Sequence, residues 1–152
     1  MSLAELGLIG VFLAGAIPWM EAVLVVPSGI ALGLDPVATV VCAVLGNVTT
    51  IFVFAYFGAN LREQIRNWRL KRNKAPDSPG LSRAMKAFHK YGIYGMALLG
   101  PLVVGTQFAA AASVAAGVKP LRASLIISGG MMIWAVTVAV LMVMFDIRFG
   151  GV

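Results

Sequence analysis

The stretch Leu3–Pro36 constrains the fold more than any other, because it is apolar almost throughout and yet carries Glu21 near its middle. It is longer than the ~20 residues that a plain transmembrane helix needs. A carboxylate is unfavourable in hydrocarbon, so such a residue usually faces a cavity or a partner. We therefore predict a membrane-embedded helical hairpin with Glu21 close to its tip. The hairpin either crosses fully and returns or is re-entrant, and in both cases its two ends lie on the same side.

Helix-breaking residues interrupt this stretch. Pro18 lies shortly before Glu21, and Pro27-Ser28-Gly29 follows it. Proline removes a backbone donor and clashes with the preceding turn, and glycine weakens a helix. We therefore expect breaks at Pro18 and, just after the carboxylate, at Pro27, Ser28 and Gly29.

The second half of the chain repeats this plan. Gly33-Leu34-Asp35-Pro36 matches Gly117-Val118-Lys119-Pro120 at an offset of 84 residues, and Gly46 matches Gly130 at the same offset. Tyr91–Gly117, which precedes the second of these turns, is again apolar and interrupted. Interrupted segments at corresponding places in two repeats are the best sequence indication of a transporter's binding site.

The interruptions in the second segment are Gly100-Pro101 and Gly105-Thr106-Gln107. We expect Gly100 and Pro101 to break its first arm and Gly105 to begin its tip. The small residues that follow allow the returning arm to pack closely against another backbone. Each half is therefore predicted to be a broken or re-entrant hairpin followed by one transmembrane helix.

The composition predicts an all-α integral membrane protein. Hydrophobic residues make up 60% of the chain and charged residues 12%, whereas ordinary soluble domains carry about 25% charged residues. The 152 residues leave room for a single membrane domain. It would consist of a first repeat over residues 3–60, a linker over 61–90 and a second repeat over 91–145.

Basic residues are concentrated in the linker. Nine of the twelve Lys and Arg residues lie between Arg62 and Lys90, which by the positive-inside rule places the linker in the cytoplasm. This distribution argues against a nucleic-acid partner in spite of the net charge of +6. Glu5 stands where a cleavable signal peptide would carry Lys or Arg, so no such signal is expected.

Two uninterrupted apolar stretches, Val37–Asn60 and Ser124–Phe145, are the predicted transmembrane spans. With the linker inside, Asp35 is predicted to lie outside, whereas Lys119 and Arg122 place the second turn inside. The two hairpins of this multi-pass protein then enter from opposite faces. The repeat is direct in sequence and inverted in space.

Four polar residues are candidates for a site or for structural hydrogen bonds. Asn47 and Thr50 lie near the centre of the first span, where they either bond between helices or line a pathway. Thr106 and Gln107, at the second tip, either complete the site or make structural hydrogen bonds only.

Glu21 is the acidic residue best placed for chemistry. Apolar surroundings favour its proton-bound form, so this carboxyl is suited to couple transport to protons, or to bind a cation directly when ionised. In the alternative interpretation Glu21 lies near the headgroups and caps a helix or forms a local ion pair.

The sequence argues against an enzyme. Cys42 and His89 are single residues of their kinds and offer no metal-ligand cluster or catalytic triad, so neither a metal nor a cofactor is expected. We predict a transporter or flippase that moves an amphipathic, cationic or lipid-linked substrate, coupled to protons or cations through Glu21. A non-transporting membrane scaffold or assembly protein is the alternative. The short chain also predicts a homodimer or higher homo-oligomer in the lipid bilayer.

The order of these motifs resembles the small multidrug export family of bacterial membrane proteins. The resemblance is carried by Glu21 before Pro27-Ser28-Gly29, by Gly46-Asn47, by the basic linker, and by Gly100-Pro101 with Gly105-Thr106. More distantly the pattern is similar to the DedA superfamily, with its two opposed re-entrant hairpins. The resemblance implies transport or flipping of a lipid-linked or amphipathic substrate across the bacterial inner membrane, driven by an ion gradient.

Overall fold

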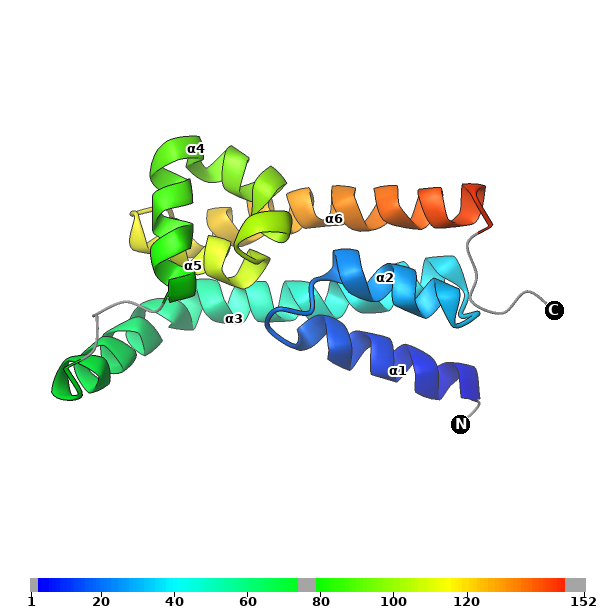
Figure 1. Cartoon of the computed structure of the whole chain (residues 1–152), viewed down its shortest axis with the longest axis horizontal. Coiled ribbons are helices and arrows are strands. Elements are labelled where there is room, and N and C mark those ends of the chain that lie inside the picture. Colours follow the sequence, from blue (N-terminus) through cyan, green and yellow to red (C-terminus); the bar gives the residue numbers. More distant parts are fainter. Residues whose placement is uncertain (1–2, 74–78, 147–152) are drawn as a thin grey trace. The chain divides into compact units, whose positions relative to one another are not determined.

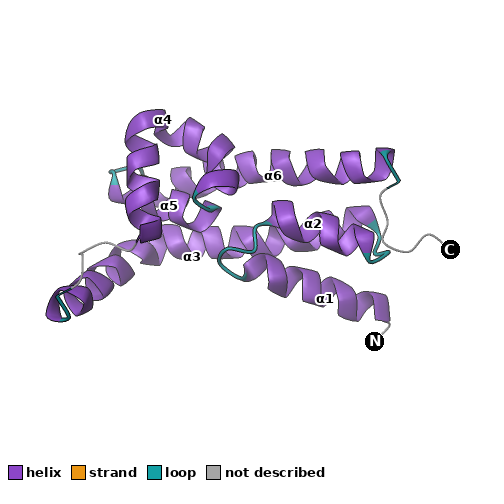
Figure 2. Cartoon of the chain, viewed as in Figure 1, coloured by secondary structure: helices purple, strands orange, loops and turns teal. Residues whose placement is uncertain are grey.

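The computed structural model describes residues 3–73 and 79–146, and within them every regular element is a helix (Figures 1 and 2). The helices are α1 (Leu3–Ala16), α2 (Ala22–Ala31), α3 (Pro36–Lys71), α4 (Pro79–Val103), α5 (Thr106–Ala115) and α6 (Pro120–Met144). The expected all-α class is confirmed. Residues 74–78 of the predicted linker lie outside the described residues, as does the side chain of Arg62.

The helices form two compact units. Unit 1 consists of Met1–Thr50 with Gly130–Val152, and unit 2 consists of Ile51–Gly129. Unit 1 contains α1, α2, the first part of α3 and the larger part of α6. Unit 2 contains α4, α5 and the remaining parts of α3 and α6. Each unit has buried apolar residues of its own, such as Val26 in unit 1 and Met96 in unit 2.

Among the described residues, two helices are long and apolar enough to cross a membrane. They are Pro36–Gly58 within α3, with 23 residues, and Pro120–Met144, with 25 residues. At about 1.5 Å per residue, both exceed the ~30 Å hydrocarbon core. Each begins with proline, whose fixed φ and missing N–H suit the first helical turn. Asp35 strengthens the first start, since its Oδ1 accepts a hydrogen bond from the Ala38 N–H at 2.8 Å. Both predicted spans are confirmed as helices of sufficient length.

In unit 1, glycines allow helix backbones to approach closely. A Cβ on Gly46 of α3 would collide with the Phe12 carbonyl oxygen of α1. A Cβ on Gly15 of α1 would lie 2.5 Å from the Ala43 carbonyl oxygen of α3. The two backbones are therefore in direct contact at this level, which is the small-residue packing typical of membrane helices.

The helix breaks differ from the predicted ones at two places. α2 continues through Pro27, Ser28 and Gly29, and α4 continues through Gly100 and Pro101 to its end at Val103. The breaks predicted at these five residues are wrong. Membrane helices tolerate proline and glycine where neighbouring helices and hydroxyl side chains satisfy the backbone.

The glycines of these two motifs serve packing instead. A Cβ on Gly29 would lie 2.6 Å from Thr39 Cγ2, and a Cβ on Gly100 would lie 3.1 Å from the Ala109 Cβ. Beside Pro27, the Ser28 hydroxyl donates a hydrogen bond to a carbonyl of its own helix at 3.0 Å. Close packing against neighbouring helices therefore explains the presence of these residues better than a break in the helix does.

The helices do end close to Pro18 and Gly105. The chain leaves helical geometry over residues 17–21, between α1 and α2, and over residues 104–105, between α4 and α5. Gly105 has a φ of 88°, a left-handed conformation that glycine adopts without a steric penalty. The flanking helices contact each other in each unit, α1 with α2 and α4 with α5.

The helices α2 and α5 have the same length and the same kind of end. Each has ten residues, and their first residues, Ala22 and Thr106, are 84 positions apart. After each helix, three successive N–H groups bond to carbonyls four, three and five residues earlier. The donors are Leu32, Gly33 and Leu34 after α2, and Ala116, Gly117 and Val118 after α5. The next helices begin at Pro36 and Pro120, which are also 84 positions apart.

Gly46→Ala is expected to destabilise the protein, because its methyl group would collide with the α1 backbone. Overpacking of this kind costs about 1–3 kcal/mol, which would lower the unfolding temperature of the purified protein in detergent. Gly10→Ala is the matched control, since nothing lies within 4 Å of its Cβ and alanine favours a helix over glycine. Equal effects of the two substitutions would contradict the close approach of α1 and α3.

Candidate functional site

Glu21 is buried at the break between α1 and α2. It is the residue that precedes α2, with extended backbone angles (φ −61°, ψ 147°), and it is 4% exposed. Its carbonyl oxygen accepts hydrogen bonds from the N–H groups of Leu24 and Val25, at 2.8 and 3.0 Å. Its carboxyl makes no capping hydrogen bond to α2, so the alternative of a helix-capping role is wrong.

Asn47 of α3 is a hydrogen-bond partner of this carboxyl. The side chain is 0% exposed, and its Nδ2 donates to Glu21 Oε2 at 3.4 Å. Asn47 directly follows Gly46, where α1 and α3 are in backbone contact. The two residues, 26 positions apart in sequence, are thus brought together in unit 1 by helix packing.

Thr50 lies one turn further along α3. Its hydroxyl donates to the Asn47 carbonyl oxygen at 2.9 Å. Of the two roles considered for Thr50, this bond to its own helix agrees with the structural one.

Thr106 and Gln107 form the second polar pair, in unit 2. Both are 0% exposed and occupy the first turn of α5, directly after Gly105. The Thr106 hydroxyl donates to Gln107 Oε1 at 3.3 Å. Tight packing of α5 against α4, at Gly100 and Ala109, accompanies their burial. The two polar pairs lie in different units.

Four other buried polar residues were not singled out from the sequence. Three donate to the carbonyl four residues earlier in the chain: Thr39, Ser113 and Ser124. The fourth, Ser128, is 8% exposed, and its hydroxyl has no hydrogen-bond partner among the described residues. Ser124 and Ser128 are four residues apart and so share one face of α6. This spacing is visible in the sequence and indicates a shared polar face.

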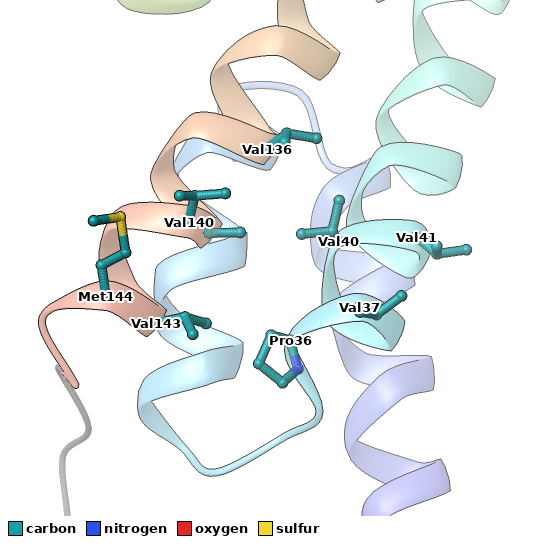
Figure 3. Close-up of a pocket in the computed structure, with 9 residues that line it drawn as sticks. Pro36, Val37, Val40, Val41, Val136, Val140, Val143 and Met144 are labelled. Atoms are coloured by element: carbon teal, nitrogen blue, oxygen red, sulfur yellow. The ribbon is translucent and has the colours of Figure 1, made fainter.

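An apolar groove of about 390 Å³ lies between α3 and α6 in unit 1 (Figure 3). Val40 of α3 points into it from one wall, and Val136 and Val140 of α6 point into it from the other. All of its lining residues are apolar, and neither Glu21 nor Asn47 is among them. The groove therefore offers nothing to a charged ligand.

The described residues contain no group of three or more His, Cys, Asp or Glu side chains that is suited to a metal ion. The chemistry that the Glu21–Asn47 pair offers is that of a buried carboxyl beside an amide. An ionised carboxylate accepts from the amide N–H groups, and a protonated carboxyl can donate to the amide oxygen. The pair can therefore accommodate both protonation states.

A family model described as "Putative small multi-drug export protein" matches residues 21–137. The chain belongs to this family. The resemblance to the small multidrug export family is confirmed, whereas the comparison does not support a link to the DedA superfamily. Comparison with curated proteins and with solved structures gave no match.

The part that matches the small multidrug export family begins at Glu21 and includes Asn47, Thr50, Thr106 and Gln107. α1 precedes it. The family's description names export, which indicates a transporter. Family membership and the two long apolar helices both indicate a location in the membrane.

Asn47→Leu is expected to lower the free energy of unfolding by about 1–3 kcal/mol, because it takes a donor from a buried carboxyl. The measurement is denaturant unfolding of the purified protein in detergent. In a Glu21→Leu background the same substitution should lower the free energy of unfolding much less. With both partners apolar, no buried carboxyl is left without its donor. An equal cost in both backgrounds would contradict the coupling of the two side chains.

Proposed function

We propose that this protein is a proton-coupled exporter of amphipathic cations, with Glu21 as the residue that binds the proton and the substrate in turn. The observation that carries this proposal is the burial of the carboxyl: Glu21 is 4% exposed and bonded to Asn47 at 3.4 Å in a chain that is 60% hydrophobic. An ionised carboxylate is strongly disfavoured in such surroundings unless a proton or a cation compensates its charge.

The substrate and the proton compete for the Glu21 carboxyl, and this competition couples the export of the substrate to the entry of the proton. A cationic substrate that enters from the cytoplasm displaces the proton and leaves the site neutral. A proton arriving from outside then displaces the substrate and restores the neutral carboxyl. Neither the empty, ionised site nor a doubly occupied site is favourable, so substrate and proton move in opposite directions. Asn47 stabilises the ionised form as a donor and orients the carboxyl throughout.

The architecture that we propose for this exchange is an inverted repeat. α1 with α2, and the end of α4 with α5, form two re-entrant hairpins that enter from opposite faces of the inner membrane. The equal lengths, the matching turns and the constant offset of α2 and α5 support a repeat. Glu21 and Gly105 occupy corresponding places in it, and Thr106 and Gln107 belong to the second tip.

A homo-oligomer completes the proposal. The described part of each chain contains two helices of full membrane length, and two helices alone can enclose little of a pathway. α3 and α6 also expose large apolar side chains such as Leu45, Val53 and Ile133. A second copy related by two-fold symmetry, the commonest arrangement of homo-oligomers, would supply further walls for a pathway.

Transport should depend on the Glu21 carboxyl. In proteoliposomes with an imposed proton gradient, we expect the purified protein to move ethidium, an amphipathic cation that reports on its own movement by fluorescence. Glu21→Gln should reduce the rate at least about tenfold, equivalent to about 1.4 kcal/mol, because an amide neither takes up a proton nor attracts a cation. Glu5→Gln, which changes an exposed acid of α1, should leave the rate nearly unchanged.

Movement of ethidium that survives Glu21→Gln would contradict the coupling role. Ethidium movement by neither the wild type nor the variants, with folded protein in the membrane, would favour the alternative of a scaffold or assembly protein.

The proposed inversion predicts opposite accessibility of two corresponding residues. Leu32 and Ala116 are 84 positions apart, are both exposed, and each directly follows its ten-residue helix. In a Cys42→Ala background, Leu32→Cys should react with a membrane-impermeant maleimide added to intact cells. Ala116→Cys should react only in inverted membrane vesicles. Labelling of both residues from the same side would exclude the inverted arrangement and leave the transport test unaffected.

A further inference from the structure

The first part of α4, residues 79–91, has an apolar face and a basic face. Leu81 and Ala84 are buried. Arg83, Lys86 and Lys90 are exposed, and their spacings of three and four residues place them in one row along the helix. We call these three residues the basic row.

Basic residues far outnumber acidic residues in the sequence of the unit that contains this row. Unit 2 contains eleven of the twelve Lys and Arg residues of the chain but only two of its six acidic residues, Glu63 and Asp77. The Lys90 ammonium lies 5.0 Å from the centre of the Tyr91 ring, and a hydrogen bond with the Tyr91 side chain raises the pKa of Lys90. Lys90 is therefore fully charged at neutral pH.

The direction of this segment differs from that of a membrane span. Figure 1 shows the first part of α4 running across the direction of the part of α3 in the same unit. Gly92 then changes the course of the chain with left-handed backbone angles (φ 66°, ψ −173°). Residues 51–58 of α3 belong both to the candidate span and to unit 2, so a segment that runs across them is expected to lie along the membrane surface.

Aromatic side chains stand at the end of the basic row. Tyr91 and Tyr94 are 47% and 68% exposed. Tyrosine is enriched at the level of the lipid headgroups, where its ring contacts acyl chains and its hydroxyl contacts water. A basic and aromatic helix parallel to the membrane plane is the arrangement of interfacial segments that recognise anionic lipids.

We propose that Arg83, Lys86 and Lys90 bind the phosphates of anionic phospholipid headgroups and so hold the first part of α4 on the membrane surface. The row supplies three positive charges on one face, and the surface of the membrane supplies the complementary negative charge. This site is separate from Glu21 and does not depend on the proposed transport.

Lipid binding by the full-length protein in detergent tests the proposal. Native mass spectrometry would compare the binding of phosphatidylglycerol and phosphatidylcholine. Each Lys or Arg near an anionic surface contributes about fivefold at low salt. Arg83→Gln/Lys86→Gln/Lys90→Gln should therefore reduce the preference for phosphatidylglycerol by about tenfold or more. Arg83→Lys/Lys86→Arg/Lys90→Arg, which keeps every charge, should retain it.

A matched variant separates a site from a general effect of net charge. Arg66→Gln/Lys71→Gln/Arg72→Gln removes the same charge from exposed positions in the last part of α3 and the turn that follows it and should retain most of the preference. In the wild type, raising the salt concentration should weaken the binding of phosphatidylglycerol but not that of phosphatidylcholine. An equal loss in the two glutamine variants, an unchanged preference in the first, or salt-independent binding would overturn the proposal.

Discussion

At Gly46 and Gly15 the backbones of α1 and α3 meet without side chains between them, and the polar centre of unit 1 depends on this contact. Asn47 directly follows Gly46, and its amide reaches Glu21 on the segment that connects α1 to α2. A larger residue at Gly46 would move α1 away from α3 and would separate the carboxyl from its donor. A substitution that disturbs the packing of α1 against α3 is therefore expected to disturb the hydrogen bond between Glu21 and Asn47 as well.

The hydrogen bond itself is long. At 3.4 Å it exceeds the usual 2.7–3.2 Å range, so Asn47 orients the carboxyl without holding it as firmly as a short charged bond would. A neutral amide suits a carboxyl that exchanges a proton for a cation, because it can bond to both the ionised and the protonated form.

The residue proposed to act in transport and the residues proposed to bind lipid belong to different units and carry opposite charges. The acid proposed to act in transport is buried in unit 1, whereas nearly all the basic residues belong to unit 2, many of them exposed. In α4 the change from a basic, exposed helix to an apolar one takes place at Gly92, whose φ of 66° turns the chain. The proposed lipid-binding row and the proposed exchange site therefore act through different elements and can be tested separately.

Composition and the length of uninterrupted apolar stretches determined the helical class, the location in the membrane and the two long spans, because a chain in lipid must satisfy its backbone within each helix. The family was also recognisable from the motif order around Glu21 and Gly105. Tertiary structure decided the rest. Pro27 and Pro101 remain within helices, and the nearby glycines Gly29 and Gly100 pack closely against neighbouring helices. The contact of Glu21 with Asn47 likewise joins residues on different helices, and no local spacing encodes such a contact, because only the packing of one helix against another creates it.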